Sequence, residues 1–216
     1  MTHLFIHGLG QTAAAWDGVL RHMGSLPDVR SVNLPPLLRG RKADYETLSG
    51  AFESLCAGVQ GPLALCGLSL GAVLALDYAL RRPERVDSLA LIAPQYRMPR
   101  LTLKLQSAAF RRMPERAFAS TGFRKAEFLS LTASMAALDF SGQVPGIACR
   151  TLLLVGEKDR ANRKAARELA DLIPGAELRT VPGAGHEVNL DAPEALAAVL
   201  SAFYAGRGQD SAGYSQ

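Results

Sequence analysis

A serine between two glycines is the residue whose surroundings best fit a catalytic nucleophile. Ser69 is the centre of Gly67–Gly71 (G-L-S-L-G), where the apolar run at 62–66 meets a segment rich in Ala and Leu. A sharp strand-to-helix turn of this kind lifts the hydroxyl out of the sheet, and the glycines let the two elements approach closely. The following helix directs its positive dipole end at a developing oxyanion. The pattern predicts a nucleophile, and the alternative is a tight structural turn.

A serine hydroxyl needs a base to become nucleophilic, and the base needs a group that orients it. His186 lies in the loop Gly183–Glu187, after a predicted strand and before the last helix. Asp159 comes soon after the predicted strand at 151–155. Because the carboxyl ends of parallel strands meet along one edge of a sheet, we expect the serine, the histidine and the aspartate to converge there.

Two backbone amides are candidates for binding the oxyanion. Leu70 follows the nucleophile, and Leu9 lies in His7–Gly10 (H-G-L-G) after the predicted first strand at 2–7. Losing one such donor typically costs a few kcal/mol of transition-state stabilisation, so this loop should be functionally sensitive. The alternative is that its glycines serve only a strand-to-helix turn. His7 is expected to support the loop and is also a candidate for contact with the substrate.

Short apolar runs alternate with helical patterns, which indicates βαβ units. Strands are predicted at 2–7, 29–34, 62–66, 86–92, 151–155 and 177–181. Helices are predicted at 13–23, 45–57 after an Asp44 cap, 70–82 and 163–172, and after an Asp191 cap with Glu194 at the capping-box position. Near-continuous apolar strands fit a sheet covered on both faces. We expect a doubly wound α/β fold with about six parallel strands.

Residues 94–149 interrupt this alternation with two or three helical stretches. Residues 97–125 hold eight basic residues and one acidic residue, a net charge of +7. We expect 1–93 and 150–205 to form the core, 94–149 a helical cap, and 206–216 a disordered tail. Arg111 and Arg112 in the cap are candidates for binding an anionic substrate, because guanidinium groups bind carboxylates bidentately. A solvated helix face is the plainer interpretation of the charge.

Composition narrows the remaining classes. The chain has 216 residues, of which 48% are hydrophobic and 20% charged, as in an ordinary globular protein. Its apolar runs are far shorter than the roughly 20 residues that span a bilayer, and no signal peptide is recognisable, so we expect a cytoplasmic protein without membrane contact. No metal-ligand spacing, phosphate loop, dinucleotide fingerprint or nucleic-acid motif occurs. A small-molecule substrate is therefore expected, without cofactor, metal or nucleic acid; the oligomeric state is not predicted.

The chain resembles the α/β-hydrolase family over almost its whole length. The resemblance is carried by His7–Gly10 with Trp16, by Gly67–Gly71, by Gly156–Asp159, and by Gly183–His186 leading into 191–194. It implies Ser69, Asp159 and His186 as the catalytic triad, with Asp159 preferred to the neighbouring Glu157 and Glu187. It also implies Leu9 and Leu70 as oxyanion donors and 94–149 as the cap that shapes the pocket. The family usually has two more strands ahead of the His-Gly loop, so this is a trimmed version.

Three functions are compatible with this resemblance. Ester hydrolysis through an acyl-enzyme is the leading hypothesis. The second is carbon–carbon bond cleavage or elimination on an anionic substrate, suggested by the basic cap. The menaquinone-pathway synthases of the family usually place Arg four residues after the nucleophile, where this chain has Val73, which weakens that match. The third is a ligand-binding protein that keeps the fold without turnover.

Overall fold

The computed structural model describes residues 1–98 and 100–206, and the side chains of 100–102, 104 and 105 are not described. In these ranges, none of the helices has both the length and the apolar character that crossing a membrane requires. The expected tail at 206–216 lies, apart from Gly206, outside the described residues.

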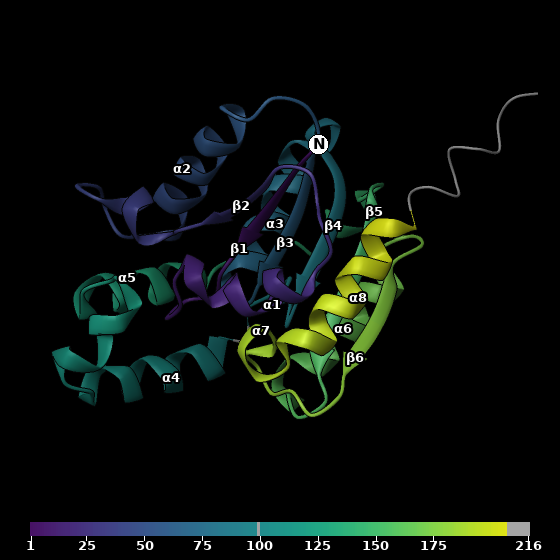
Figure 1. The fold of residues 1–216 in the computed structure, drawn as a ribbon. Coiled ribbons are helices and arrows are strands. Elements are labelled where there is room, and N and C mark those ends of the chain that lie inside the picture. The colour runs from purple at the N-terminus through teal and green to yellow at the C-terminus, as the bar shows by residue number, and fades with distance from the viewer. Residues whose placement is uncertain (99, 207–216) are drawn as a thin grey trace, which may run out of the picture.

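Six parallel strands form one sheet, which confirms the expected fold class (Figure 1). The strands are β1 (Thr2–Ile6), β2 (Val29–Val32), β3 (Leu63–Leu68), β4 (Val86–Ile92), β5 (Arg150–Gly156) and β6 (Glu177–Val181). Their order is β2-β1-β3-β4-β5-β6. The chain therefore leaves β1 toward one edge and returns past it to β3, so the carboxyl ends of β1 and β3 flank the switch point where such sheets bind ligands.

Helices cover both faces of the sheet. The α-helices are α1 (Asp17–His22), α2 (Tyr45–Ala57), α3 (Leu70–Arg81), α4 (Arg100–Arg112), α5 (Lys125–Met135), α6 (Arg160–Leu172), α7 (Val188–Asp191) and α8 (Pro193–Ala205). The 3-10 helices are η1 (Ala13–Trp16), η2 (Pro35–Leu38), η3 (Pro83–Arg85), η4 (Glu115–Thr121) and η5 (Val144–Gly146). Figure 1 shows α1 beside α8 on one face.

The alternation of side chains along the strands divides the core in two. On β1, Leu4 and Ile6 join the apolar cluster under α2, α3 and α6, while Phe5 joins the cluster under α1 and α8 with Trp16. Successive residues of a strand point to opposite faces, so a strand that is apolar throughout fills both clusters. This is why the continuous apolar runs predict the sheet so well.

Three helix starts differ from the prediction. The helix predicted at 13–23 begins as the 3-10 helix η1, and its α-helical part α1 begins only at Asp17. Helix α6 begins at Arg160 rather than 163, because the Asp159 side chain accepts the backbone N–H of Asn162 and caps the helix. The predicted Asp191 cap of the last helix is wrong. Asp191 ends α7, and its carboxylate accepts the Gly185 N–H at 2.7 Å, while α8 begins at Pro193 without a side-chain cap.

Residues 94–149 are helical, as expected, although 115–121 form a 3-10 helix. Within the described part of this segment, β-pairing is limited to one bridge between Arg97 and Asp139. Figure 1 shows α4 and α5 packed together to one side of the sheet. Basic side chains help to join the segment internally. The Lys125 ammonium donates to the backbone oxygens of Arg111 and Met113, at 2.8 and 2.6 Å.

Candidate active site

Ser69 occupies the sharp turn between β3 and α3. Its backbone has φ +52° and ψ −111°, a conformation that costs a non-glycine residue free energy and persists only where the surroundings impose it. A Cβ atom on Gly67 would lie 2.3 Å from the Gly71 oxygen, and one on Gly71 would lie 2.2 Å from the Ile6 oxygen. Both glycines are therefore required by backbone packing, and the sequence is that of a nucleophile turn.

The predicted acid and base meet at the ends of β5 and β6. The two strands are in register to their last residues, where Gly156 pairs with Val181. The His186 ring donates its Nδ1 proton to Asp159 Oδ2 at 3.0 Å, since an ionised carboxylate only accepts. Burial raises the pKa of Asp159, but hydrogen bonds from His186 and Asn162 outweigh it and hold the pKa below its ordinary value. Asp159 is therefore an anion at neutral pH.

Asn162 is a site residue that the sequence argument missed. Its amide nitrogen donates to both Asp159 oxygens, at 3.0 and 2.8 Å, and its oxygen accepts from Gln95 at 2.7 Å. In the sequence, the feature that could have identified Asn162 was its position three residues after Asp159, an aspartate that caps a helix. The side chain fills the remaining acceptor positions of Asp159 and so fixes the carboxylate that faces His186.

The neighbouring glutamates have other partners. Glu157 accepts the Gly183 N–H at 2.8 Å, and Glu187 accepts from the Gln11 amide at 3.0 Å. In the described part of the chain neither carboxylate is hydrogen-bonded to His186. The geometry therefore favours Asp159 as the orienting acid.

The loop after β1 lies against the nucleophile turn. Ile6 pairs with Gly67 across β1 and β3, and a Cβ atom on Gly8 would lie 3.5 Å from that of Ser69. The buried His7 ring accepts the Leu34 N–H at 3.1 Å, so its other nitrogen donates to the Gly8 oxygen at 2.8 Å. Both ring nitrogens are thus engaged. This agrees with a supporting role and speaks against the predicted contact with substrate.

A buried amide network joins this loop to the loop that carries His186. The Gln11 oxygen accepts the Gly8 N–H at 3.3 Å and the Asn189 amide at 3.1 Å. The Gln11 nitrogen donates to Glu187 at 3.0 Å and to the Asn189 oxygen at 3.2 Å. Gln11 and Asn189 are both buried. The bonds of Gln11 to Glu187 and Asn189 join residues 176 and 178 positions apart, so no local pattern in the sequence predicts them.

The three predicted triad residues line one cavity of about 610 Å³. Its wall is mainly apolar, and the full set is Ser69, Leu70, Val73, Ala93, Gln95, Met98, Leu103, Gln106, Met135, Asp159, Ala161, Asn162 and His186. A Ser69–His186 hydrogen bond is not formed in the described structure; in enzymes without substrate such bonds are often long and tighten on binding. The cavity can hold an apolar group beside a hydroxyl nucleophile.

The two cap arginines proposed for anion binding do not line this cavity. Arg111 is exposed and borders a separate groove between α4 and α5, with Leu103 and Thr132. Arg112 is exposed and donates to the Ala108 backbone oxygen. Among the described lining residues of the cavity there is no Arg or Lys. Their positions do not support the predicted role.

Leu70 lines the cavity, whereas Leu9 is partly buried against the core. As the first residue of α3, Leu70 has no intrahelical acceptor for its N–H, so this amide is free to bind an anion. Among the described residues, no three His, Cys, Asp or Glu side chains are grouped so that they could hold a metal.

Comparison with known proteins identifies the family of the chain. The model of the Alpha/beta hydrolase family matches residues 4–199. The chain is 31% identical to a pimeloyl-(acyl-carrier protein) methyl ester esterase of Nitrosomonas europaea, over 42% of the chain and only 36% of that protein. It is 26% identical to the enzyme of the same name from Nitrosospira multiformis, over 93% of both chains. The solved structure of NosK from Streptomyces actuosus superposes with a TM-score of 0.81 at 24% identity, covering 96% of this chain and 99% of that one.

Proposed function

Because the chain belongs to the alpha/beta hydrolase family, we propose that it is a serine hydrolase that cleaves carboxylic esters through Ser69, His186 and Asp159. One observation carries the proposal. A serine on a strained turn shares a cavity with a histidine that is hydrogen-bonded, at 3.0 Å, to a buried aspartate. Two relatives are named as methyl ester esterases, which supports an ester as the substrate class.

The proposed reaction has two halves. Ser69 Oγ attacks the acyl carbonyl while His186 Nε2 takes its proton, and the same nitrogen then protonates the departing alcohol. Water, activated by His186, hydrolyses the acyl-enzyme and releases the acid. Asp159 keeps the Nδ1 proton on the far side of the ring, so Nε2 is free to accept, and it stabilises the imidazolium that forms.

The oxyanion of each tetrahedral intermediate would be bound by the N–H groups of Leu70 and Leu9. The free amide at the start of α3 and the contact of Gly8 with the Ser69 turn support this assignment. We also propose that residues 94–149 act as a cap, since Leu103, Gln106 and Met135 supply one wall of the cavity.

The test uses a fluorophosphonate probe and a panel of p-nitrophenyl esters. We expect wild-type protein to be labelled once and to hydrolyse the esters, and Ser69→Ala to lose labelling and at least about a thousandfold in kcat. Ser130→Ala on the exposed side of α5 is the matched control and should resemble wild type. Unchanged turnover in Ser69→Ala would reject the mechanism. Folded wild-type protein that neither reacts nor hydrolyses would favour a ligand-binding role.

A further inference from the structure

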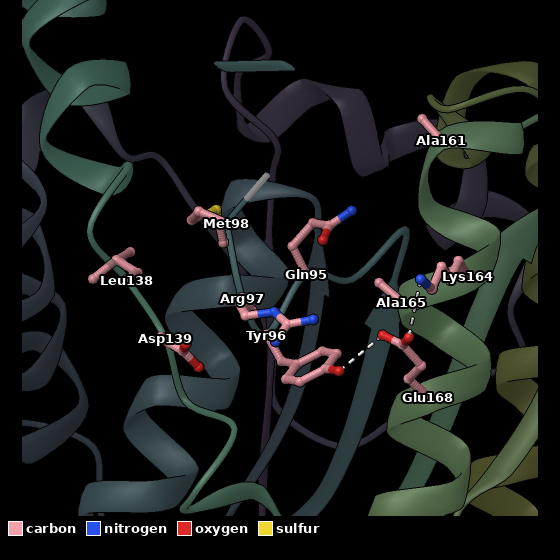
Figure 2. Close-up of a pocket in the computed structure, with 10 residues that line it drawn as sticks. All are labelled: Gln95, Tyr96, Arg97, Met98, Leu138, Asp139, Ala161, Lys164, Ala165 and Glu168. Atoms are coloured by element: carbon pink, nitrogen blue, oxygen red, sulfur yellow. Dashed lines mark hydrogen bonds and ion pairs between the residues drawn. The ribbon is translucent and has the colours of Figure 1, made fainter. Parts of the chain in front are cut away.

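A second pocket, of about 370 Å³, adjoins the catalytic cavity (Figure 2). Gln95, Met98 and Ala161 line both, so one molecule of sufficient length could occupy both spaces. The second pocket lies between the segment after β4, the segment after α5, and helix α6. The two spaces differ in their basic side chains. Arg97 and Lys164 line the second pocket, whereas the described lining of the cavity has no Arg or Lys.

Arg97 is the most conspicuous of these charges. It follows Gln95 by two residues, and Figure 2 shows both side chains directed toward α6, with the guanidinium group extending away from Asp139. Arg97 is exposed, and within the described structure no carboxylate lies at ion-pair distance from it. A guanidinium fork that faces a pocket without a partner is suited to bind a carboxylate in two-point geometry.

The pocket lining has two basic and two acidic side chains, but both acids have partners other than Arg97. Glu168 accepts the Tyr96 hydroxyl at 2.8 Å and lies 3.6 Å from the Lys164 ammonium. Burial, followed by this hydrogen bond, raises the pKa of Tyr96, so the hydroxyl stays protonated and keeps donating. Asp139 accepts the Ser141 N–H at 3.0 Å. Both acids thus have partners within the protein, and Lys164, which is exposed and only loosely paired with Glu168, is a second cation at the same rim.

We propose that this pocket binds a carboxylate at the far end of the substrate, with Arg97 as the main contact and Lys164 as the second. The preferred ester would place an apolar segment in the cavity and its anionic end group beside Arg97. The inference rests on the proposed esterase function and assigns its substrate class. It also moves anion recognition from the cap helices to the segment directly after β4.

The test compares esters that differ only in the end group. Mono-p-nitrophenyl adipate and p-nitrophenyl hexanoate carry the difference on the acyl side; butanoate esters of ω-hydroxyhexanoic acid and of hexanol carry it on the alcohol side. We expect wild type to prefer the carboxylate in at least one pair. Arg97→Gln should lower kcat/KM for that ester about tenfold, the low end for a charge-assisted hydrogen bond at a solvated site, and Lys164→Gln about threefold. The neutral partner should change less than about twofold.

Arg112→Gln is the matched control, because it removes the same charge from an exposed position that borders neither space. It should leave the ratio between charged and neutral esters unchanged. Equal effects of Arg97→Gln on both members of each pair would overturn the subsite while leaving the esterase function intact. Failure of wild type to hydrolyse any of the four esters, with no fluorophosphonate labelling, would overturn the proposed function and the subsite with it.

Discussion

A single carboxylate, that of Asp159, has two structural roles. One oxygen accepts the Asn162 backbone N–H and starts α6, and the other faces His186. A helix cap and a catalytic acid are usually weighed as alternatives for an aspartate after a strand, but here the residue that caps the helix is also the acid that we propose for the triad. The cap fixes the carboxylate on a rigid element, and the Asn162 amide completes its acceptor positions.

Asn162→Leu should therefore impair both catalysis and stability. We expect kcat to fall about tenfold with little change in KM, because the orientation of His186 is lost rather than substrate binding. The free energy of unfolding at pH 7 should fall by about 1 to 3 kcal/mol, the usual cost of leaving a charged acceptor unpaired. Asn162→Asp would place a second carboxylate beside Asp159 and should be worse in both measurements.

The stability loss of Asn162→Leu should depend on pH. The folded pKa of Asp159 is lowered from 3.8, so the group contributes stability that is present above the unfolded pKa and lost as the pH falls through the folded pKa. Removing Asn162 raises that folded pKa toward its ordinary value. The difference between wild type and variant, measured by urea unfolding, should be full at pH 7 and shrink below about pH 4. A difference independent of pH would contradict this account.

At the scale of elements, the groups that we propose for catalysis lie on loops that must keep a fixed separation. Gln11 joins two of them through bonds to Gly8 and Glu187. Gln11→Met keeps most of the side-chain volume and removes these bonds. We expect kcat to fall about tenfold, and the unfolding free energy to fall by about 1 to 3 kcal/mol because buried partners lose hydrogen bonds. Gln143→Met, at an exposed position before η5, is the control and should behave as wild type; an unchanged kcat in Gln11→Met would refute the role of the network.

The elements themselves were largely predictable, because each strand is an apolar run closed by turn residues. The strand at 86–92 and the Asp44 cap agree with the structure residue for residue. Errors arose where a local signal competes with a distant partner. Asp191 has the local environment of a helix cap, yet it binds Gly185 across a loop. Gln11 was missed because its partners Glu187 and Asn189 lie far along the chain, which no spacing reveals. Asn162 lies only three residues from Asp159, but its position alone does not tell that its side chain turns back to the carboxylate.

At the scale of the whole molecule, the described basic side chains of residues 94–149 do not line the cavity that holds Ser69. Arg124 pairs with Glu127 at 2.7 Å, and Lys125 binds backbone oxygens at the end of α4. The Arg124 pair lies at the start of α5, whereas the Lys125 contacts join α5 to the end of α4. The exposed Arg111 and Arg112 lie outside the cavity. The excess charge of 97–125 does not by itself predict a cation in the cavity, because the sequence does not tell which face of each helix turns inward.

The cavity wall that the cap supplies should decide which chain lengths are accepted. Met135 on α5 is buried and lines the cavity opposite the core. Met135→Phe narrows this space, so kcat/KM for p-nitrophenyl decanoate should fall about tenfold, as expected when a pocket loses room for one or two methylenes, while the acetate changes less than about threefold. Met113→Phe, an exposed position at the cap tip, should leave the profile unchanged. A parallel loss on all chain lengths in Met135→Phe would mean that the cap wall does not measure the acyl chain.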